Sequence, residues 1–211
     1  MGENIVITIA RQYGSGGKTI GAMLAKELGI SCYSREILKM ASEESGINEG
    51  LFGMSDEKIK KAPWFKILSR PYDGELLTPE DRDFVSDDNL FNYQAKVIRD
   101  LAEKEPCVIV GRCADYILDQ EAYPTLNVFI HADMPHRISR VLERYGDTEV
   151  DVRKRLERKD RNRKTYYRYY TDREWGKYTN YQINLDSGYL GVDQCVRIIV
   201  DTVRAMDRGN D

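Results

Sequence analysis

The sequence predicts an α/β fold in which a five-stranded parallel sheet lies between two layers of helices. Short apolar segments rich in β-branched residues alternate with longer segments whose apolar residues recur every three or four positions. This alternation is typical of strands joined by helical crossovers, which build parallel sheets covered on both faces. The predicted strands span residues 5–9, 30–33, 107–110, 126–130 and 181–185.

The first predicted strand leads into a glycine-rich turn with the layout of a phosphate-binding loop, or P-loop. In such a loop, glycines adopt positive φ angles, so that main-chain N–H groups converge on phosphate oxygens at a helix N-terminus. A lysine at its end can reach the β- and γ-phosphates, and the next hydroxyl can ligate Mg²⁺. The residues that we expect to bind the phosphates of ATP and, through the threonine, the metal are Gly14, Ser15, Gly16, Gly17, Lys18 and Thr19.

One residue of this loop departs from the usual pattern G-x-x-x-x-G-K-[ST]. Counting back from Gly17 places Gln12 where the first glycine belongs. The alternative interpretation is an ordinary glycine turn before a helix. The apolar strand before the turn and the amphipathic segment after it favour the P-loop. The presence of Gln12 puts in doubt the backbone geometry at the start of the loop more than that of its Gly-Lys-Thr end.

The composition argues against a nucleic-acid or membrane partner and favours the cytoplasm. The 211 residues are 41% hydrophobic and 32% charged, with a formal net charge of −3, whereas general binders of nucleic acid or anionic membranes are normally basic. No apolar run reaches membrane-spanning length, and the N-terminus lacks the features of a signal peptide. The four cysteines are scattered without a C-x-x-C pair, which argues against a zinc site and favours a reducing compartment.

We expect a single domain with two inserted segments. The core covers about residues 1–34, 86–147 and 178–208. Residues 35–85 are expected to form an acceptor-side insert of short helices and loops, because they include the least periodic part of the chain and several prolines. Residues 148–174 are expected to form a long polar helix, or a helix pair, within a lid that covers about residues 148–177.

Basic charge is concentrated in residues 151–177, which carry eleven Lys and Arg residues and five Asp and Glu residues, a local net charge of +6. Three interpretations compete. The stretch can be a solvated helix face with i,i+4 ion pairs, a nucleic-acid surface in which tyrosines stack on bases, or a lid that brings arginines to a transferred phosphoryl group. A P-loop in the same domain favours the lid, with Arg158, Arg161 and Arg163 as cations that bind the triphosphate.

Two further arginines follow predicted strands. Ligands of parallel α/β sheets bind at the carboxyl ends of the strands. Arg35 follows the second predicted strand and Arg112 follows the third. Both therefore lie where a bound ligand is expected and are candidates to contact it, and a structural salt bridge is the alternative for Arg112.

Taken in order along the chain, these elements resemble the cytidylate kinase-like family of P-loop nucleoside monophosphate kinases. The resemblance covers nearly the whole chain. It includes the strand and loop at residues 7–18, the Val-Gly-Arg segment at 110–112, the D-x-x-R element at 160–163 and the Leu-Asp-Ser turn at 185–187. The order and spacing of these elements are more specific than any one of them.

The resemblance implies an enzyme that transfers the γ-phosphoryl group of ATP to a small phosphate acceptor, most simply a nucleoside monophosphate, with the help of Mg²⁺. It implies that Arg112 binds the acceptor phosphate and that Asp160 and Arg163 belong to the closed lid. Phosphoryl transfer needs positioning and cationic neutralisation of charge more than covalent chemistry, which agrees with these residue types. The residues expected to act in catalysis are Lys18, Arg158, Asp160 and Arg163, with Arg161 at the triphosphate.

Several departures place the chain in a divergent branch of the family. Ser34 replaces an aspartate after the second strand, Leu156 replaces an arginine of the lid, and two tyrosines at 166–167 replace a proline-leucine step. The base specificity of the family does not carry over to this chain. Two other functions therefore stay open: a P-loop kinase for another nucleoside or metabolite, and a nucleotide-binding sensor without catalysis.

Overall fold

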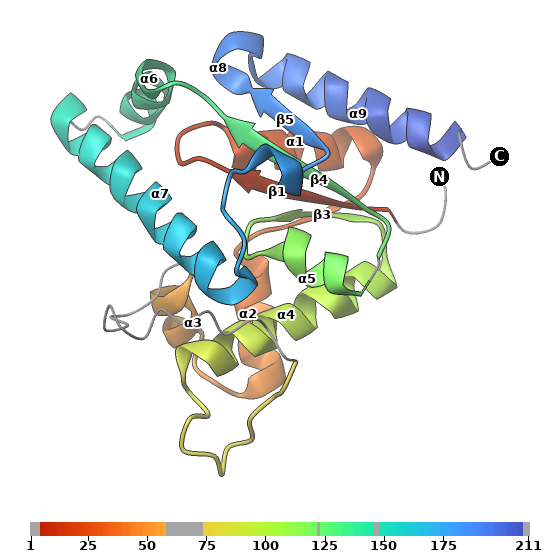
Figure 1. The fold of residues 1–211 in the computed structure, drawn as a ribbon, viewed down its shortest axis with the longest axis vertical. Coiled ribbons are helices and arrows are strands. Elements are labelled where there is room, and N and C mark those ends of the chain that lie inside the picture. Colours follow the sequence, from red (N-terminus) through yellow and green to blue (C-terminus); the bar gives the residue numbers. More distant parts are fainter. Residues whose placement is uncertain (1–4, 58–73, 122, 146–147, 209–211) are drawn as a thin grey trace.

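The computed structural model describes residues 5–57, 74–121, 123–145 and 148–208, and Figure 1 shows their arrangement. A five-stranded sheet lies at the centre, with all neighbouring strands parallel and the order β2-β3-β1-β4-β5. The predicted five-stranded parallel sheet is thereby confirmed. Its strands are β1 (Val6–Arg11), β2 (Ser31–Tyr33), β3 (Cys107–Val110), β4 (Thr125–His131) and β5 (Ile183–Asp186).

Strand β1 is the central strand. It pairs with β3 and with β4, so that Ile9 lies opposite Val110 on one side and Val128 on the other. All of its residues except Arg11 are buried, as expected for a strand that helices cover on both faces. Because the strands are parallel, the residues that follow them meet at one edge of the sheet, and the candidate site lies at this edge.

One face of the sheet is covered by α1 (Gly17–Leu28) and α9 (Val192–Arg208). Apolar side chains of both helices, among them Leu24 and Ile199, form one core cluster with Ile9 of β1. Helix α1 ends at Gly29, whose left-handed backbone (φ 67°) closes the last turn.

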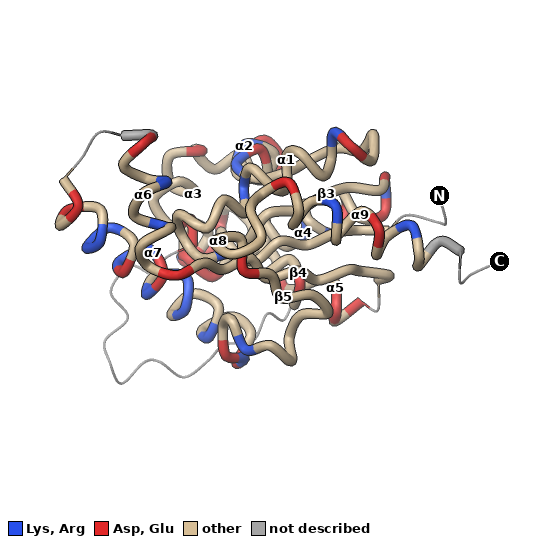
Figure 2. Tube along the Cα trace, turned by 90° about the horizontal axis from the view of Figure 1, so that it is seen from above, with Lys and Arg blue, Asp and Glu red and all other residues tan. Residues whose placement is uncertain are grey.

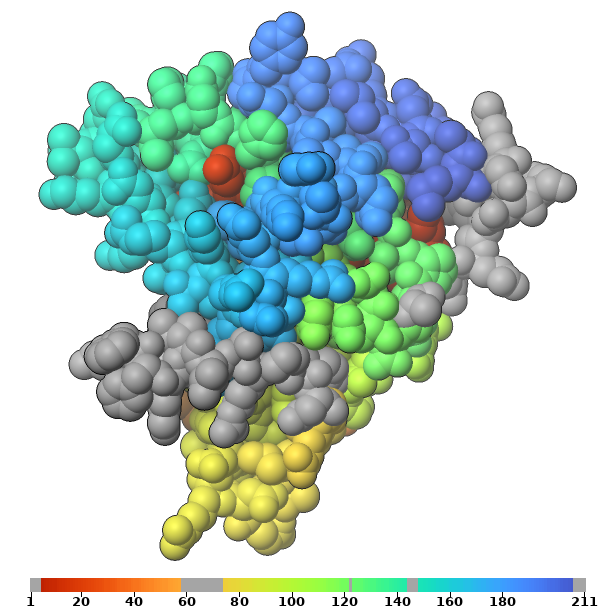
Figure 3. Space-filling model, viewed as in Figure 1, coloured from red at the N-terminus to blue at the C-terminus, as the bar shows by residue number. Residues whose placement is uncertain are grey.

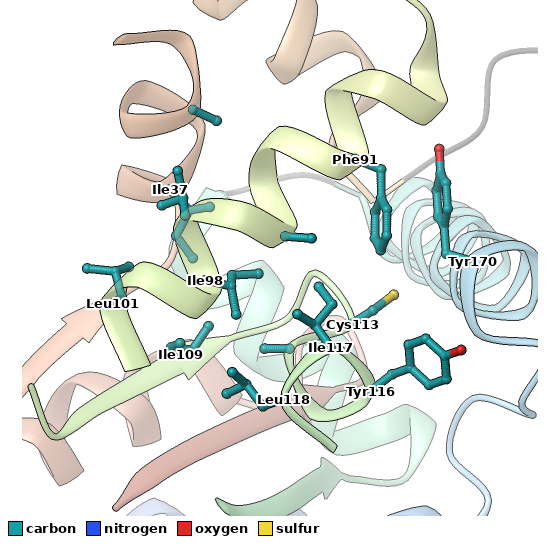
Figure 4. Packing of buried hydrophobic residues seen from close by; sticks show 14 of the residues in the cluster. Ile37, Phe91, Ile98, Leu101, Ile109, Cys113, Tyr116, Ile117, Leu118 and Tyr170 are labelled. Atoms are coloured by element: carbon teal, nitrogen blue, oxygen red, sulfur yellow. The ribbon is translucent and has the colours of Figure 1, made fainter. Parts of the chain in front are cut away.

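The other face is covered by α4 (Asp87–Lys104) and α5 (Ala114–Gln120), with α2 (Glu36–Ser45) and α3 (Glu49–Ser55) packed against α4. Figure 4 shows this core, in which Ile37, Ile98 and Ile117 come from α2, α4 and α5. Helix α4 begins where the Ser86 hydroxyl accepts the Asn89 N–H, a capping contact typical of serine.

Two helices lie along the carboxyl edge of the sheet, α6 (Met134–Tyr145) and α7 (Glu149–Thr171). Helix α7 is one continuous helix of 23 residues, and Figure 2 shows Lys and Arg along its length. Its N-terminal half packs Val152 and Leu156 against α6. Its C-terminal half buries tyrosines against α4, where the Tyr170 ring stacks on Phe91 with centroids 3.8 Å apart (Figure 4). The segment predicted as a lid is thus fixed to the body at both halves in this state.

The remaining short elements are η2 (Tyr178–Asn180) and α8 (Ser187–Leu190), which flank β5. The expected acceptor-side insert, residues 35–85, contains α2 and α3 and then, from residue 74 to residue 85, no further helix or strand. Residues 58–73 of this insert lie outside the described residues.

Candidate active site

The glycine-rich turn joins β1 to α1 and has the backbone that a phosphate loop requires. Gly14 and Gly16 both have positive φ angles, 83° and 82°, so their N–H groups turn inward in a way that other residues rarely allow. The first N–H groups of α1 have no partner within the helix, and the helix dipole adds positive potential at the same place. Lys18 and Thr19 stand exposed in this first turn.

Gln12, which replaces the first glycine of the usual pattern, fixes the opening of the loop to β4. Its main-chain N–H donates to the Ile130 carbonyl at 3.0 Å, and its side-chain Oε1 accepts the Ala132 N–H at 3.1 Å. A glycine at this position would have no side chain and could not make the second of these contacts. The Ser15 hydroxyl in turn donates to the Gln12 carbonyl at 2.9 Å, so the loop is held by its own residues before any ligand binds.

Arg140 of α6 lies against the glycines of the loop. Its Nη1 donates to the Gly14 carbonyl at 3.4 Å, and a Cβ atom on Gly16 would lie only 2.8 Å from the same Nη1. A side chain at residue 16 would therefore fill the space between the loop and this guanidinium. The loop and Arg140 together form a cationic cradle that fits the phosphates of a nucleotide.

This cradle also fits a magnesium ion that is bound mainly through phosphates. Among the described residues, no group of three His, Cys, Asp or Glu side chains could hold a metal ion. Magnesium keeps several waters and uses one or two protein ligands with the substrate phosphates. The exposed hydroxyl of Thr19 is the side chain that suits this chemistry.

Asp160 of α7 lies directly at the phosphate loop. Its Oδ1 accepts the Tyr13 N–H at 2.7 Å, and its Oδ2 accepts a hydrogen bond from Nη1 of the buried Arg137 at 2.6 Å. Burial raises the pKa of Asp160, and the Tyr13 N–H and the Arg137 charge offset only part of that rise. Asp160 therefore links α6, α7 and the loop in one contact, and its direct partner is Arg137 rather than Arg163.

Beside the loop, three arginines and two carboxylates from distant parts of the chain form a partly buried group, which we call the arginine cluster. Glu57 lies between two arginines: Arg11 forms an ion pair with its carboxylate, and Arg163 Nε donates to its Oε2 at 2.7 Å. Arg112 Nη2 lies 3.0 Å from Asp56 Oδ1. The cluster consists of Arg11, Asp56, Glu57, Arg112 and Arg163.

The carboxylates of the arginine cluster differ in their pKa values. Burial alone would raise the pKa of Glu57, but the charges of Arg11 and Arg163 lower it by more, and it ends well below its usual value. Burial raises the pKa of Asp56, and Arg112 offsets only part of that effect. Glu57 is therefore the carboxylate that the arginines hold firmly in its charged form.

The backbone at the end of β3 is strained where it enters this cluster. Gly111, Arg112 and Cys113 have successive positive φ angles of 84°, 59° and 57°, and such angles are uncommon for residues with a side chain. A Cβ atom on Gly111 would overlap the guanidinium of Arg11 and the carboxylate of Glu57. Only glycine leaves room for these two groups beside the strand end.

Two cavities adjoin these groups. A pocket of about 360 Å³ opens between β4, α6 and α7 and is lined by Gln12, Arg137, Asp160 and Trp175 among others. In Figure 3 the N-terminal segment, red, is visible here between the green and blue segments. A second cavity of about 20 Å³ lies within the arginine cluster and shares Trp175 with the first.

The structure gathers some of the predicted site residues and leaves others apart. The phosphate-loop residues, Asp160, Arg163 and Arg112 lie around this edge of the sheet. Arg35 is exposed at the start of α2, and Arg158 is exposed on α7. Arg161 is also exposed and lies 3.8 Å from Glu157 of its own helix, although it reaches the rim of the larger pocket.

The sequence analysis missed five residues of this site. Asp56 and Glu57 lie in a segment without periodicity, and nothing in the sequence marks them. The sequence did contain a sign that Arg11 belongs to a site, because it is a charged residue close to the end of an apolar strand. It contained a similar sign for Arg137 and Arg140, because they lie three residues apart on the helix that follows β4.

Comparisons with known proteins agree with this geometry. Residues 6–189 match the cytidylate kinase-like family. No curated protein matches the chain. Among solved structures, an uncharacterized protein from Eubacterium ventriosum is 27% identical with a TM-score of 0.69, over 95% of this chain and 98% of that one. Shikimate kinase from Bacteroides thetaiotaomicron is 13% identical with a TM-score of 0.53, over 95% and 98% of the two chains, which shows a shared fold. In the described part of the chain, no helix has the length and apolar character needed to cross a membrane.

Proposed function

Because the chain belongs to the cytidylate kinase-like family, we propose that it is an ATP-dependent kinase that phosphorylates a nucleoside monophosphate. The observation that carries this proposal is the position of Arg11. A Cβ atom on Gly17 of the phosphate loop would lie 2.6 Å from the Arg11 Cβ, while the guanidinium of the same arginine pairs with Glu57 in the arginine cluster. In this proposal, one side chain connects the donor site at the loop with a cationic acceptor site.

On the donor side, the proposal assigns the triphosphate to the cradle of the loop, Lys18 and Arg140. Lys18 extends from the first helical turn and can neutralise charge on the β- and γ-phosphates. The Thr19 hydroxyl would hold Mg²⁺, and the ion would neutralise charge on the phosphates. Asp160 and Arg137 position α7 on the loop rather than contacting the nucleotide themselves.

On the acceptor side, the proposal assigns the phosphate of the monophosphate to the arginine cluster. Guanidinium groups bind phosphate oxygens through paired N–H donors. An acceptor phosphate oxygen attacks the γ-phosphorus, a new P–O bond forms, the bond to the β-γ bridging oxygen breaks, and ADP leaves. The arginines balance the charge of two phosphate groups that would otherwise repel each other.

The direct test is ADP release from ATP with a panel of nucleoside monophosphates, nucleosides and metabolites. The Lys18→Ala variant should lose at least about a hundredfold in kcat because it lacks the cation at the γ-phosphate. Lys26→Ala, which removes an exposed lysine in the last turn of the same helix, is the matched control and should keep full activity.

The outcomes separate this proposal from its alternatives. Turnover confined to a nucleoside or a metabolite would identify a kinase of another substrate class. Tight ATP binding without turnover on any acceptor would indicate a nucleotide sensor. Full activity of Lys18→Ala would contradict the donor site itself. We further place the protein in the cytoplasm, and the absence of disulfides among its four cysteines, all of which are described, supports this.

A further inference from the structure

Glu57 occupies the position in the arginine cluster where a bound anion is expected. Its two carboxylate oxygens face Arg11 and Arg163, with an Arg11 Nη2 contact to Oε2 at 3.1 Å in addition to the ion pair. This arrangement of two guanidinium groups around one anion is the usual way in which arginines bind a phosphate. Arg11 is also the residue whose Cβ packs on the phosphate loop.

The cluster has no room for a ligand while Glu57 is present. The cavity among its side chains measures about 20 Å³, which is enough for roughly one water molecule. A phosphate group can therefore enter only if Glu57 moves away. The positive φ of Glu57, 49°, is a conformation that costs a residue with a side chain free energy, so that leaving this position releases strain.

The charges in the cluster suit a dianion better than the carboxylate that is there. With Glu57 in place, three guanidinium groups face two carboxylates. Without it they face Asp56 alone, and the excess of two positive charges matches a phosphate monoester. The cluster is also incompletely paired: Arg112 is only 3% exposed, and its Nε has no hydrogen-bond partner in the described structure.

We propose that Glu57 is an internal substitute for the acceptor phosphate, and that a phosphate monoester displaces it from Arg11 and Arg163 when it binds. This inference rests on the proposed function and names the group that the acceptor must carry. In the unliganded protein the acceptor site is closed by the chain's own carboxylate. The acceptor binds only by competing with Glu57.

The first test is calorimetric titration with inorganic phosphate in the absence of ATP. Glu57→Gln keeps the size of the side chain but removes its charge, and it should bind phosphate about tenfold more tightly than the wild type. Glu49→Gln, which changes an exposed carboxylate at the other end of α3, should leave the affinity unchanged. The gain should disappear in Glu57→Gln/Arg11→Gln, and acetate should show a much smaller gain because it carries one charge. An unchanged or weaker phosphate affinity of Glu57→Gln would overturn the proposal.

The second test uses the wild-type protein, so that it stands even if a variant fails to fold. Hydrogen exchange of residues 49–57 should become faster when inorganic phosphate is added, because Glu57 leaves the cluster. A structural ion pair predicts unchanged or slower exchange, and that result would also overturn the proposal. Neither test needs turnover. Kinase activity without these effects would refute only the role of Glu57, whereas these effects without kinase activity would refute only the proposed function.

Discussion

Arg11 shows how one residue can join two parts of a site. It ends β1, its Cβ packs on the phosphate loop, and its guanidinium reaches the arginine cluster. Burial lowers the pKa of its guanidinium, the charge of Arg163 lowers it further, and Glu57 raises it in part. Two arginines this close and this shielded from water, with side chains 12% exposed, need an anion between them, which is why this position needs either Glu57 or a ligand.

Two arginines allow a direct comparison at the scale of single residues. Arg140 touches the loop, whereas Arg161 is 69% exposed on α7. Arg140→Ala should raise the Kd for ATP about tenfold, because it removes a cation from the phosphate cradle, a loss of about 1.4 kcal/mol. Arg161→Ala should raise it by less than about threefold, since an exposed charge is screened by water. Titration with ATP measures both, and a larger effect of Arg161→Ala would reverse the assignment of these arginines.

At the scale of elements, α7 combines a highly charged, solvent-facing half with a half that packs as a core helix does. Its first half carries exposed charges and touches the loop through Asp160, whereas its end buries Tyr166 and Tyr170 against α4. The alternative interpretation, a nucleic-acid surface of stacking tyrosines, does not match this packing, because Tyr166, Tyr167 and Tyr170 are all buried. The helix is therefore anchored more strongly at its C-terminal end.

This asymmetry predicts how α7 responds to a nucleotide. Without ligand, amide hydrogens in residues 149–160 should exchange faster than those in residues 166–171, because fewer apolar contacts hold the first half. An ATP analogue with an acceptor should slow exchange in the first half only, since that half lies at the loop. Hydrogen exchange with mass spectrometry measures both segments in one experiment. Equal protection of the first half with and without ligand would show that α7 does not act as a lid.

At the scale of the whole molecule, Asp115 joins the helices on one face of the sheet to α7. The Tyr167 hydroxyl donates to Asp115 Oδ2 at 2.7 Å, and both residues are buried. Burial raises the pKa of Asp115 to about 6, although Tyr167 and main-chain N–H groups partly oppose this. The folded protein therefore binds a proton at a pH where the unfolded chain does not.

The stability of the protein should accordingly contain a term that increases as the pH falls. The pKa of Asp115 is above its unfolded value of 3.8, so between pH 7 and pH 5 protonation of the folded state should add about 1 kcal/mol to the free energy of unfolding. The Asp115→Asn variant has no carboxylate to protonate, so its free energy of unfolding lacks this pH-dependent contribution. Urea unfolding of both proteins at the two pH values measures the difference, in which the other titrating groups cancel. A constant difference would mean that Asp115 titrates normally.

The sequence by itself determined the features that depend on neighbours along the chain. The alternation of apolar segments predicted the parallel sheet, and residues 14–19 predicted the phosphate loop, because strand, turn and helix N-terminus follow one another without a gap. Arg112 could be singled out in the same way, because it follows a predicted strand closely along the chain and ligands of parallel sheets bind at the carboxyl ends of the strands.

The tertiary structure alone decided which side chains face one another. Arg11 is 46 residues from Glu57, and Arg163 is 106 residues from it. No periodic pattern connects positions so far apart, because their contact depends on how α3 and α7 pack around the sheet. Asp160 likewise forms an ion pair with Arg137 because α6 packs on α7. Local pattern sets the backbone of the glycine-rich loop, whereas long-range packing sets the charge balance of the arginine cluster.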